Sequence, residues 1–251
     1  MFSRGIPILT YHSLDESRSV ISISPLMFKK QMEYLWKKGY QTFSLSEAIS
    51  FIQRKKPFPE KTFVITFDDG YKNVYTEAFP VLRRCGFKGT IFLITDYCEK
   101  FNNWPTQPHS IECRPLLSWS EIEEMHKYGI EFGSHTSTHP DLTRIPIRQA
   151  EQEIAHSKSK IQDYLGAEVK VFAYPCGKYN SKIKEIVQKQ FLGACSAKLG
   201  KVKTDCDLYM LNRIDMYYLR SEKLFSIIST HTLDRYLQFR QVFRELKMIF
   251  T

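Results

Sequence analysis

Apolar residues along the chain form two kinds of pattern, which alternate. Short apolar runs at 6–12 (IPILTYH), 61–67 (KTFVITF) and 88–95 (KGTIFLIT) have the length and the β-branched and aromatic content of buried strands. Longer segments between them, such as 25–38, carry apolar residues at the spacing of one helical face. Strands that alternate with helices indicate parallel βαβ units, and therefore an α/β protein.

The same patterns extend over most of the chain. Further strands are predicted near 40–44, 130–135 and 169–175. Helices are predicted at 25–38 and 46–54, in a segment that ends near Cys85, in a segment that begins at Ser118, at 147–165, at 181–191 and along the tail at 222–250. About seven such repeats favour a barrel over an open sheet. Residues 96–117 lack a period and are predicted to form a long loop. Because no linker or repeat interrupts the pattern, we expect residues 1–251 to form one domain.

Composition and charge narrow the class of protein. Hydrophobic residues make up 43% of 251, and no apolar run approaches the ~18 residues that suggest a membrane span. The net charge of +9 favours anionic partners, but no basic run of nucleic-acid type is present, so no nucleic-acid partner is expected. The N-terminus lacks a secretory-signal pattern, which predicts a cytoplasmic protein. The six cysteines include no CxxC pair and are predicted to be free thiols.

Polar residues follow four of the predicted strands. The segments are LTYHSL (9–14), TFDDG (66–70), SHTSTHPDL (134–142) and FAYPCGKYN (172–180). In parallel barrels the carboxyl ends of the strands are where active sites assemble. We therefore expect the side chains of these four segments to meet at one end of the barrel.

His135 and His139 are four residues apart, a spacing that can bring two imidazoles to one ion. This spacing also arises by chance on surfaces, but an aspartate at another strand end completes a set of two histidines and one carboxylate. Such a set leaves positions open for water, as catalytic metal sites do, and suits Zn²⁺ best, with Co²⁺ or Ni²⁺ as alternatives.

The adjacent Asp68 and Asp69 fit two roles in such a site. One carboxylate would bind the ion, and the other would take a proton from water whose pKa the ion has lowered. The alternative is a simple surface turn, because Asp-Asp-Gly is common in turns. The strongly apolar strand before the pair favours the site over the turn.

These motifs together resemble the polysaccharide deacetylase family, which is carbohydrate esterase family 4 with the NodB-homology domain. TFDDG, HTSTH and FAYPCGKYN match its first three motifs over about residues 60–214. The resemblance implies a distorted (β/α)7-type barrel and a metal-dependent N-deacetylase that converts the acetamide of an N-acetylated sugar to an amine and acetate. Residue by residue, it implies the following site: Asp68 as the general base, Asp69, His135 and His139 as metal ligands, the Cys176 N–H as an oxyanion donor, and Tyr174 and Pro175 as the adjoining wall.

Two departures from the family pattern point to one subgroup. The third motif of the family often carries an arginine that orients the base, and this arginine is missing from FAYP. Poly-N-acetylglucosamine deacetylases share that loss, and their motifs are circularly permuted, so that the general acid comes from an N-terminal histidine. His12 in LTYHSL fits this position. His231 in IISTH is the competitor, and we favour His12 because it follows the first strand.

Several interpretations stay open at this point. The site chemistry equally permits a metal amidase that acts on a non-sugar amide, and the fold permits a non-catalytic glycan-binding protein. The tail has an apolar face that is expected to pack on the barrel. The alternative is that this face lies on a membrane surface, which would suit a lipid-linked sugar as the substrate. The face comprises Tyr236, Phe239, Phe243, Leu246 and Phe250. The pattern does not specify the sugar or the oligomeric state.

Overall fold

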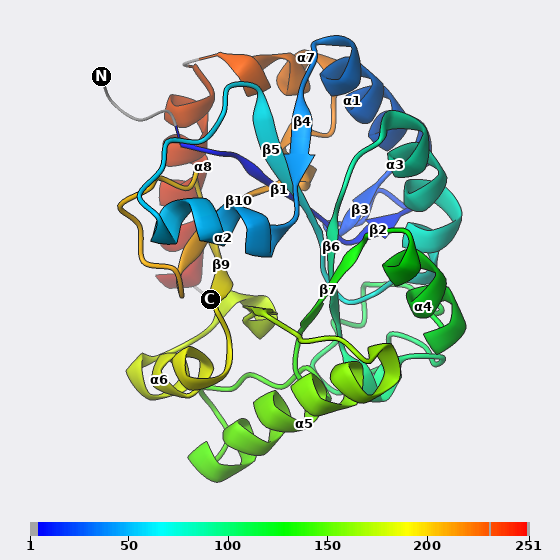
Figure 1. Cartoon of the computed structure of the whole chain (residues 1–251), viewed down its shortest axis with the longest axis vertical. Coiled ribbons are helices and arrows are strands. Elements are labelled where there is room, and N and C mark those ends of the chain that lie inside the picture. The colour runs from blue at the N-terminus through cyan, green and yellow to red at the C-terminus, as the bar shows by residue number, and fades with distance from the viewer. Residues whose placement is uncertain (1–4, 231, 250–251) are drawn as a thin grey trace.

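The structure is a computed structural model that describes residues 5–230 and 232–249 (Figure 1). The strands are β1 (Ile8–Tyr11), β2 (Ser13–Leu14), β3 (Ser22–Ile23), β4 (Gln41–Phe43), β5 (Thr62–Phe67), β6 (Thr90–Leu93), β7 (Glu131–Ser134), β8 (Val171–Ala173), β9 (Gly193–Leu199) and β10 (Leu211–Asp215). The α-helices are α1 (Pro25–Lys37), α2 (Leu45–Gln53), α3 (Phe79–Cys85), α4 (Trp119–Lys127), α5 (Ile147–Leu165), α6 (Ser181–Gln190), α7 (Glu222–Phe225) and α8 (Thr232–Ile249).

Seven parallel strands close into a barrel in the order β1-β10-β9-β8-β7-β6-β5, and β5 returns to β1. Closure is visible at Leu9, which lies opposite Ile214 of β10 and opposite Ile65 of β5. The eighth strand of this sheet, β4, pairs with the first half of β5 outside the ring. The predicted (β/α)7-type barrel is therefore confirmed.

Buried residues form two clusters because successive strand side chains point to opposite faces. One cluster contains Leu9, Ile65 and Ile91 and packs under the helices that surround the barrel in Figure 1. The other contains Ile8 and Val64, their neighbours along the strands, together with the apolar face of α2. Helix α2 thus closes the end of the barrel where the strands begin, and the carboxyl ends of the strands are left for a site.

Helix starts follow the signals in the sequence. Ser24 accepts a hydrogen bond from the N–H of Met27 and Pro25 opens α1, as a capped helix with proline at its first position requires. Ser118 and Glu121 form the predicted capping box at the start of α4. Local chemistry alone therefore accounts for these boundaries.

The tail differs from the continuous helix predicted for 222–250. It consists of α7, a 3₁₀ turn at Ser226–Ser229 and α8, and α8 packs on the barrel through the buried Leu233 and Leu237. The expected apolar face is not the packed one: Phe239 (58% exposed), Phe243 and Leu246 face outward, and Tyr236 is half-buried. Phe250 and His231 lie outside the described residues.

No helix in the described ranges combines the length and the apolar character that crossing a bilayer would need.

Candidate active site

A cavity of ≈ 280 Å³ opens at the carboxyl ends of the barrel strands. Each motif predicted from the sequence contributes to its lining, and the residues concerned are His12 after β1, Asp68 and Asp69 after β5, His135 and His139 after β7, and Tyr174 and Cys176 after β8. Pro175 is buried between the last two and does not line the cavity. Four segments far apart in the sequence therefore meet at one place.

Asp68 and Asp69 both face the cavity because the chain leaves strand geometry directly after β5. Asp69 has φ 71° and Gly70 has φ 72°, so the backbone turns at these two residues. The positive φ of Gly70 favours glycine there, and an added Cβ atom would also lie 2.9 Å from Leu93 Cδ2, so that the leucine side chain would have to shift. This turn answers why two like charges can be neighbours: the usual alternation of side chains ends before the second one.

Three side chains converge as a candidate metal-binding group: Asp69, His135 and His139, whose ligand atoms lie within 4.8 Å of one another. Asp69 Oδ1 is 3.5 Å from His135 Nε2 and 3.7 Å from His139 Nε2. These separations are too long for hydrogen bonds, and they leave room for an ion between the three atoms.

Hydrogen bonds on the far side of each ring leave the Nε2 atoms available as ligands. His135 Nδ1 donates to the carbonyl of Ala173 at 2.7 Å. The Thr106 hydroxyl donates to the carbonyl of His139 at 2.7 Å, and its oxygen can therefore accept from His139 Nδ1, 3.3 Å away. A metal-binding histidine commonly uses its second nitrogen in this way, which sets the tautomer.

The electrostatics of this group also fit a cation. Burial, with a contribution from His135, holds the pKa of His139 well below its ordinary value, so the ring is neutral and can donate a lone pair. Burial raises the pKa of Asp69, against the opposing effect of His12 and His135. A buried carboxylate beside the neutral ring of His139 is what a divalent ion would stabilise, and with three protein ligands such a site keeps open positions.

Asp68 is held by a partner that the motifs did not identify. Arg213, in β10, donates from Nη1 to Asp68 Oδ1 at 2.7 Å and from Nη2 to Oδ2 at 2.8 Å, while its Nε donates to the carbonyl of Ser196. Burial by itself raises the pKa of Asp68, but Arg213, with smaller effects from His12 and His135, lowers it well below the ordinary range. Asp68 is therefore ionised and fixed in orientation.

The arginine that seemed to be missing from the third motif is thus supplied from another strand. Arg213 is only 6% exposed and lies 145 residues from Asp68 in the chain. The available signal was a cation within a short strand, LNRID, between the buried Leu211 and Ile214. A buried arginine requires a partner, but the strand alone does not say which carboxylate it meets.

His12 lies on the other side of Asp68. Its Nε2 is 3.7 Å from Asp68 Oδ2, and its side chain is 24% exposed, so it reaches both the carboxylate and the cavity. His231, the alternative to His12, lies outside the described residues.

Tyr174 and Cys176 form another part of the cavity wall. The Tyr174 hydroxyl is buried and has no hydrogen-bond partner within residues 5–230 and 232–249. Cys176 has φ 54° and lines the cavity. Left-handed residues outside glycine are uncommon and gather at functional sites, and this cavity is bordered by several: Asp69, Thr136, His139 and Cys176.

Comparisons with known proteins agree with this geometry. The family profile described as polysaccharide deacetylase matches residues 55–192. The Bacillus subtilis protein YxkH is 31% identical over 210 residues, which cover 83% of this chain and 70% of YxkH. The poly-beta-1,6-N-acetyl-D-glucosamine N-deacetylase of Staphylococcus epidermidis is 29% identical over 203 residues, or 77% of this chain and 67% of that protein.

A solved structure shows the same likeness in three dimensions. The Streptococcus pyogenes deacetylase PplD, in complex with acetate, superposes with a TM-score of 0.75 at 25% identity, covering 85% of this chain and 92% of PplD. Sequence profile, relatives and fold agree. This chain belongs to the polysaccharide deacetylase family, hydrolases that act on the N-acetyl amide of sugars.

Proposed function

We propose that the protein is a metal-dependent N-deacetylase, which hydrolyses the acetamide of an N-acetylated polysaccharide, oligosaccharide or lipid-linked sugar to a free amine and acetate. The observation that carries this proposal is one cavity that holds an ionised carboxylate, Asp68, directly beside the candidate metal-binding group of Asp69, His135 and His139. The relative from Staphylococcus epidermidis is named for deacetylation of a poly-N-acetylglucosamine, and PplD was solved with acetate, the product expected here.

Asp69, His135 and His139 would hold one divalent cation, Zn²⁺ in preference to Co²⁺ or Ni²⁺. When bound, such a cation would polarise the acetamide carbonyl and lower the pKa of a water molecule at the site to about 7. Asp68 would remove the proton from the attacking water. Because Arg213 keeps its pKa low, Asp68 is a weak base, and it is suited to water that has already been made acidic.

His12 would act as the general acid that protonates the leaving amine nitrogen. Its place beside Asp68 with access to the cavity supports this role, because proton donor and proton acceptor must reach the same reacting centre. The N–H of Cys176 would donate to the developing oxyanion, and Tyr174 would form the adjoining wall.

The test is acetate release by the zinc-loaded protein. The substrates are short N-acetylglucosamine oligomers, lipid-linked or nucleotide-linked acetamido sugars and, for comparison, N-acetylated amines that contain no sugar. The matched control is Asp68→Asn, which keeps the shape of the side chain and removes the base. We expect acetate from at least one sugar and none above the control from the other amides. No acetate above that control from any sugar would contradict the proposal.

A further inference from the structure

Two loops that are far apart in the sequence both contribute to the walls of the active-site cavity. The first joins β2 to β3, and its Val20 and Ile21 line the cavity beside His12. The second is the long segment after β6, which lines the cavity through Thr106, Gln107, Pro108 and Ile111. We refer to residues 15–21 as the first loop and to residues 102–114 as the second loop.

The second loop lies within residues 96–117, which were predicted to form a long loop, and it is held by backbone pairing at its base. Isolated bridges join Phe101 to Pro115 and Tyr71 to Leu116. The N–H of Asn102 donates to the carbonyl of Arg114 at 3.0 Å, so the loop leaves and returns at one point. This pairing fixes the base of the loop, and the part that reaches over the cavity depends on other contacts.

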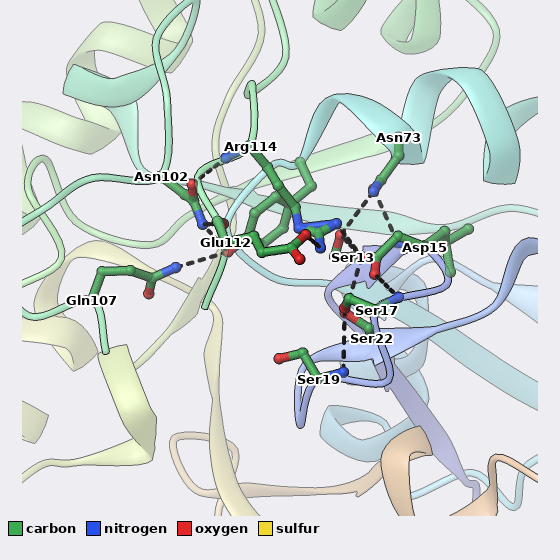
Figure 2. A network of polar contacts seen from close by, with 12 residues as sticks. Ser13, Asp15, Ser17, Ser19, Ser22, Asn73, Asn102, Gln107, Glu112 and Arg114 are labelled. Atoms are coloured by element: carbon green, nitrogen blue, oxygen red, sulfur yellow. Dashed lines mark hydrogen bonds and ion pairs between the residues drawn. The ribbon is translucent and has the colours of Figure 1, made fainter. Parts of the chain in front are cut away.

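Asp15 organises the first loop. Its carboxylate accepts hydrogen bonds from the hydroxyls of Ser13 and Ser22 and from the N–H of Ser17, the last at 2.9 Å (Figure 2). Asn73 adds a connection to the segment after β5, because its amide donates to the Ser13 hydroxyl at 2.7 Å. Burial acts to raise the pKa of Asp15, but these serine contacts lower it below its ordinary value, so Asp15 carries a charge.

The two loops meet through a single ion pair. Arg114 Nη1 lies 2.6 Å from Asp15 Oδ2, and both side chains are largely buried, at 13% and 15% exposure (Figure 2). On the side of the second loop, Arg114 Nη2 donates to Glu112 and the Arg114 N–H donates to Asn102 Oδ1. Within the described part of the chain, Asp15 has no other ion-pair partner than Arg114.

The same network extends to the strand end that carries the base. The Asn102 amide donates to the hydroxyl of Tyr71 at 3.2 Å, and the Gln107 amide donates to that hydroxyl at 3.2 Å. Tyr71 follows Gly70 directly and is fully buried. The wall residue Gln107 is therefore linked both to the Asp15–Arg114 pair, through Asn102, and to the turn that presents Asp68 and Asp69.

We propose that Asp15 and Arg114 are positioning residues that act as a clasp, holding the first and second loops at the spacing that substrate binding requires. This inference rests on the proposed deacetylase function. Neither residue lines the cavity, so neither is expected to touch the reacting atoms. Their effect is on the walls that contact the sugar, and it should therefore appear in KM while the Asp68 chemistry stays intact.

The key variant is Arg114→Met, which keeps the length and the apolar stem of the side chain and removes the charge. Asp15 would retain its serine donors, so no buried carboxylate is left without a partner and the variant should fold. We expect KM for an N-acetylglucosamine oligomer to rise about tenfold, and kcat to stay within about threefold of the wild type. Arg114→Lys should restore part of the affinity, because it keeps the charge but not the forked geometry.

Two further measurements separate the clasp from a general loss of structure. The KM of the double variant Asp15→Asn/Arg114→Met should be no higher than the KM of the worse single variant, because both substitutions remove the same ion pair. Hydrogen exchange should become faster in both loops of Arg114→Met, with zinc content and exchange elsewhere unchanged. The control is Arg84→Met, which breaks the exposed Arg84–Glu33 pair between α3 and α1 and should leave KM unchanged.

Each outcome distinguishes the clasp from the proposed function. If the wild type releases acetate and Arg114→Met has the KM of the wild type, or loses kcat at unchanged KM, the clasp is wrong and the deacetylase stands. If the wild type releases no acetate, the proposed function is wrong. The clasp as a structural link would then be judged by hydrogen exchange alone, and unchanged exchange in both loops would overturn it.

Discussion

Both ends of the barrel contain buried or partly buried carboxylates. The two ends differ in the hydrogen bonds that these carboxylates accept. Where the strands begin, Glu131 Oε2 accepts hydrogen bonds from the N–H of Leu45 at 3.0 Å, from the N–H of Ser46 at 3.3 Å and from the hydroxyl of Thr90 at 2.7 Å. The first two donors are free N–H groups at the start of α2, where a negative charge is favourable. Glu131 Oε2 thus holds the start of α2 across the barrel.

Where the strands end, the carboxylates are incompletely satisfied by the chain. Asp68 receives two hydrogen bonds from Arg213, and Asp69 is approached by His135 and His139 only at 3.5 and 3.7 Å. The ligand atoms of Asp69, His135 and His139 converge on a shared space, as the ligands of one cation would. A second hollow of ≈ 400 Å³ beside Glu131 is larger than the ≈ 280 Å³ cavity of the site.

The comparison shows that the size of a hollow does not by itself identify the active site. Glu131 lies beside the larger hollow, but its Oε2 accepts three hydrogen bonds within the protein, which indicates a structural role. At the other end, the ligand atoms converge on one another without bonding directly. Unused bonding capacity at a fixed position is what a site for a metal and a substrate requires.

Asp69→Ala should produce the largest change, because it removes one of the three proposed metal ligands. We expect the bound metal to be lost on dialysis and acetate release to fall by about 10³-fold or more, since electrostatic stabilisation of the developing charge is lost with it. Metal content by atomic emission and initial rates at saturating Zn²⁺ would check this. Retention of stoichiometric zinc would contradict the assignment of the ligands.

His12→Ala tests the proton donor separately from the metal. We expect kcat to fall about 10²–10⁴-fold while metal content is unchanged, because His12 does not belong to the metal-binding group. His231→Ala is the matched variant and should retain activity. If His231→Ala is the damaging substitution and His12→Ala is not, the general acid comes from the tail.

Arg213→Met should shift the pH dependence of kcat/KM. A general base works only when ionised, so activity falls as the pH drops through its pKa. In the wild type, Arg213 holds the pKa of Asp68 low and this limb lies far below neutrality. Without Arg213, burial raises the pKa and the acidic limb moves to higher pH.

The profile should be measured between about pH 5 and pH 9 alongside Arg213→Lys, which keeps the charge and should place the limb near that of the wild type. If the acidic limb of the profile lies at the same pH in Arg213→Met as in the wild type, the pKa of Asp68 does not control it.

Glu131→Gln should have the smallest effect on catalysis and act on stability instead. We expect the free energy of unfolding to fall by about 1 kcal/mol, because the charge at the start of α2 is lost, while kcat/KM per folded molecule is unchanged. Urea denaturation and steady-state rates would check both parts. The control is Glu123→Gln on the surface of α4, whose exposed pair with Lys127 should contribute little. A large loss of kcat/KM in Glu131→Gln would show that the two ends are coupled.

Local sequence determined much of this protein. Strand and helix patterns, caps at Ser24 and Ser118, and the TFDDG and HTSTH motifs depend on neighbours within a few residues, and they predicted the barrel and the ligand candidates. The turn at Asp69 and Gly70 is local as well, because glycine permits the required backbone angle.

Tertiary structure decided what depends on residues far apart in the chain. Arg213 meets Asp68 across 145 residues, and Arg114 meets Asp15 across two loops that showed no regular pattern. The packed face of α8 was also decided there, since Leu233 and Leu237 are buried and Phe239 is not. Periodicity shows that a residue needs a buried partner or an apolar contact, but only closure of the barrel determines which residues are brought within reach.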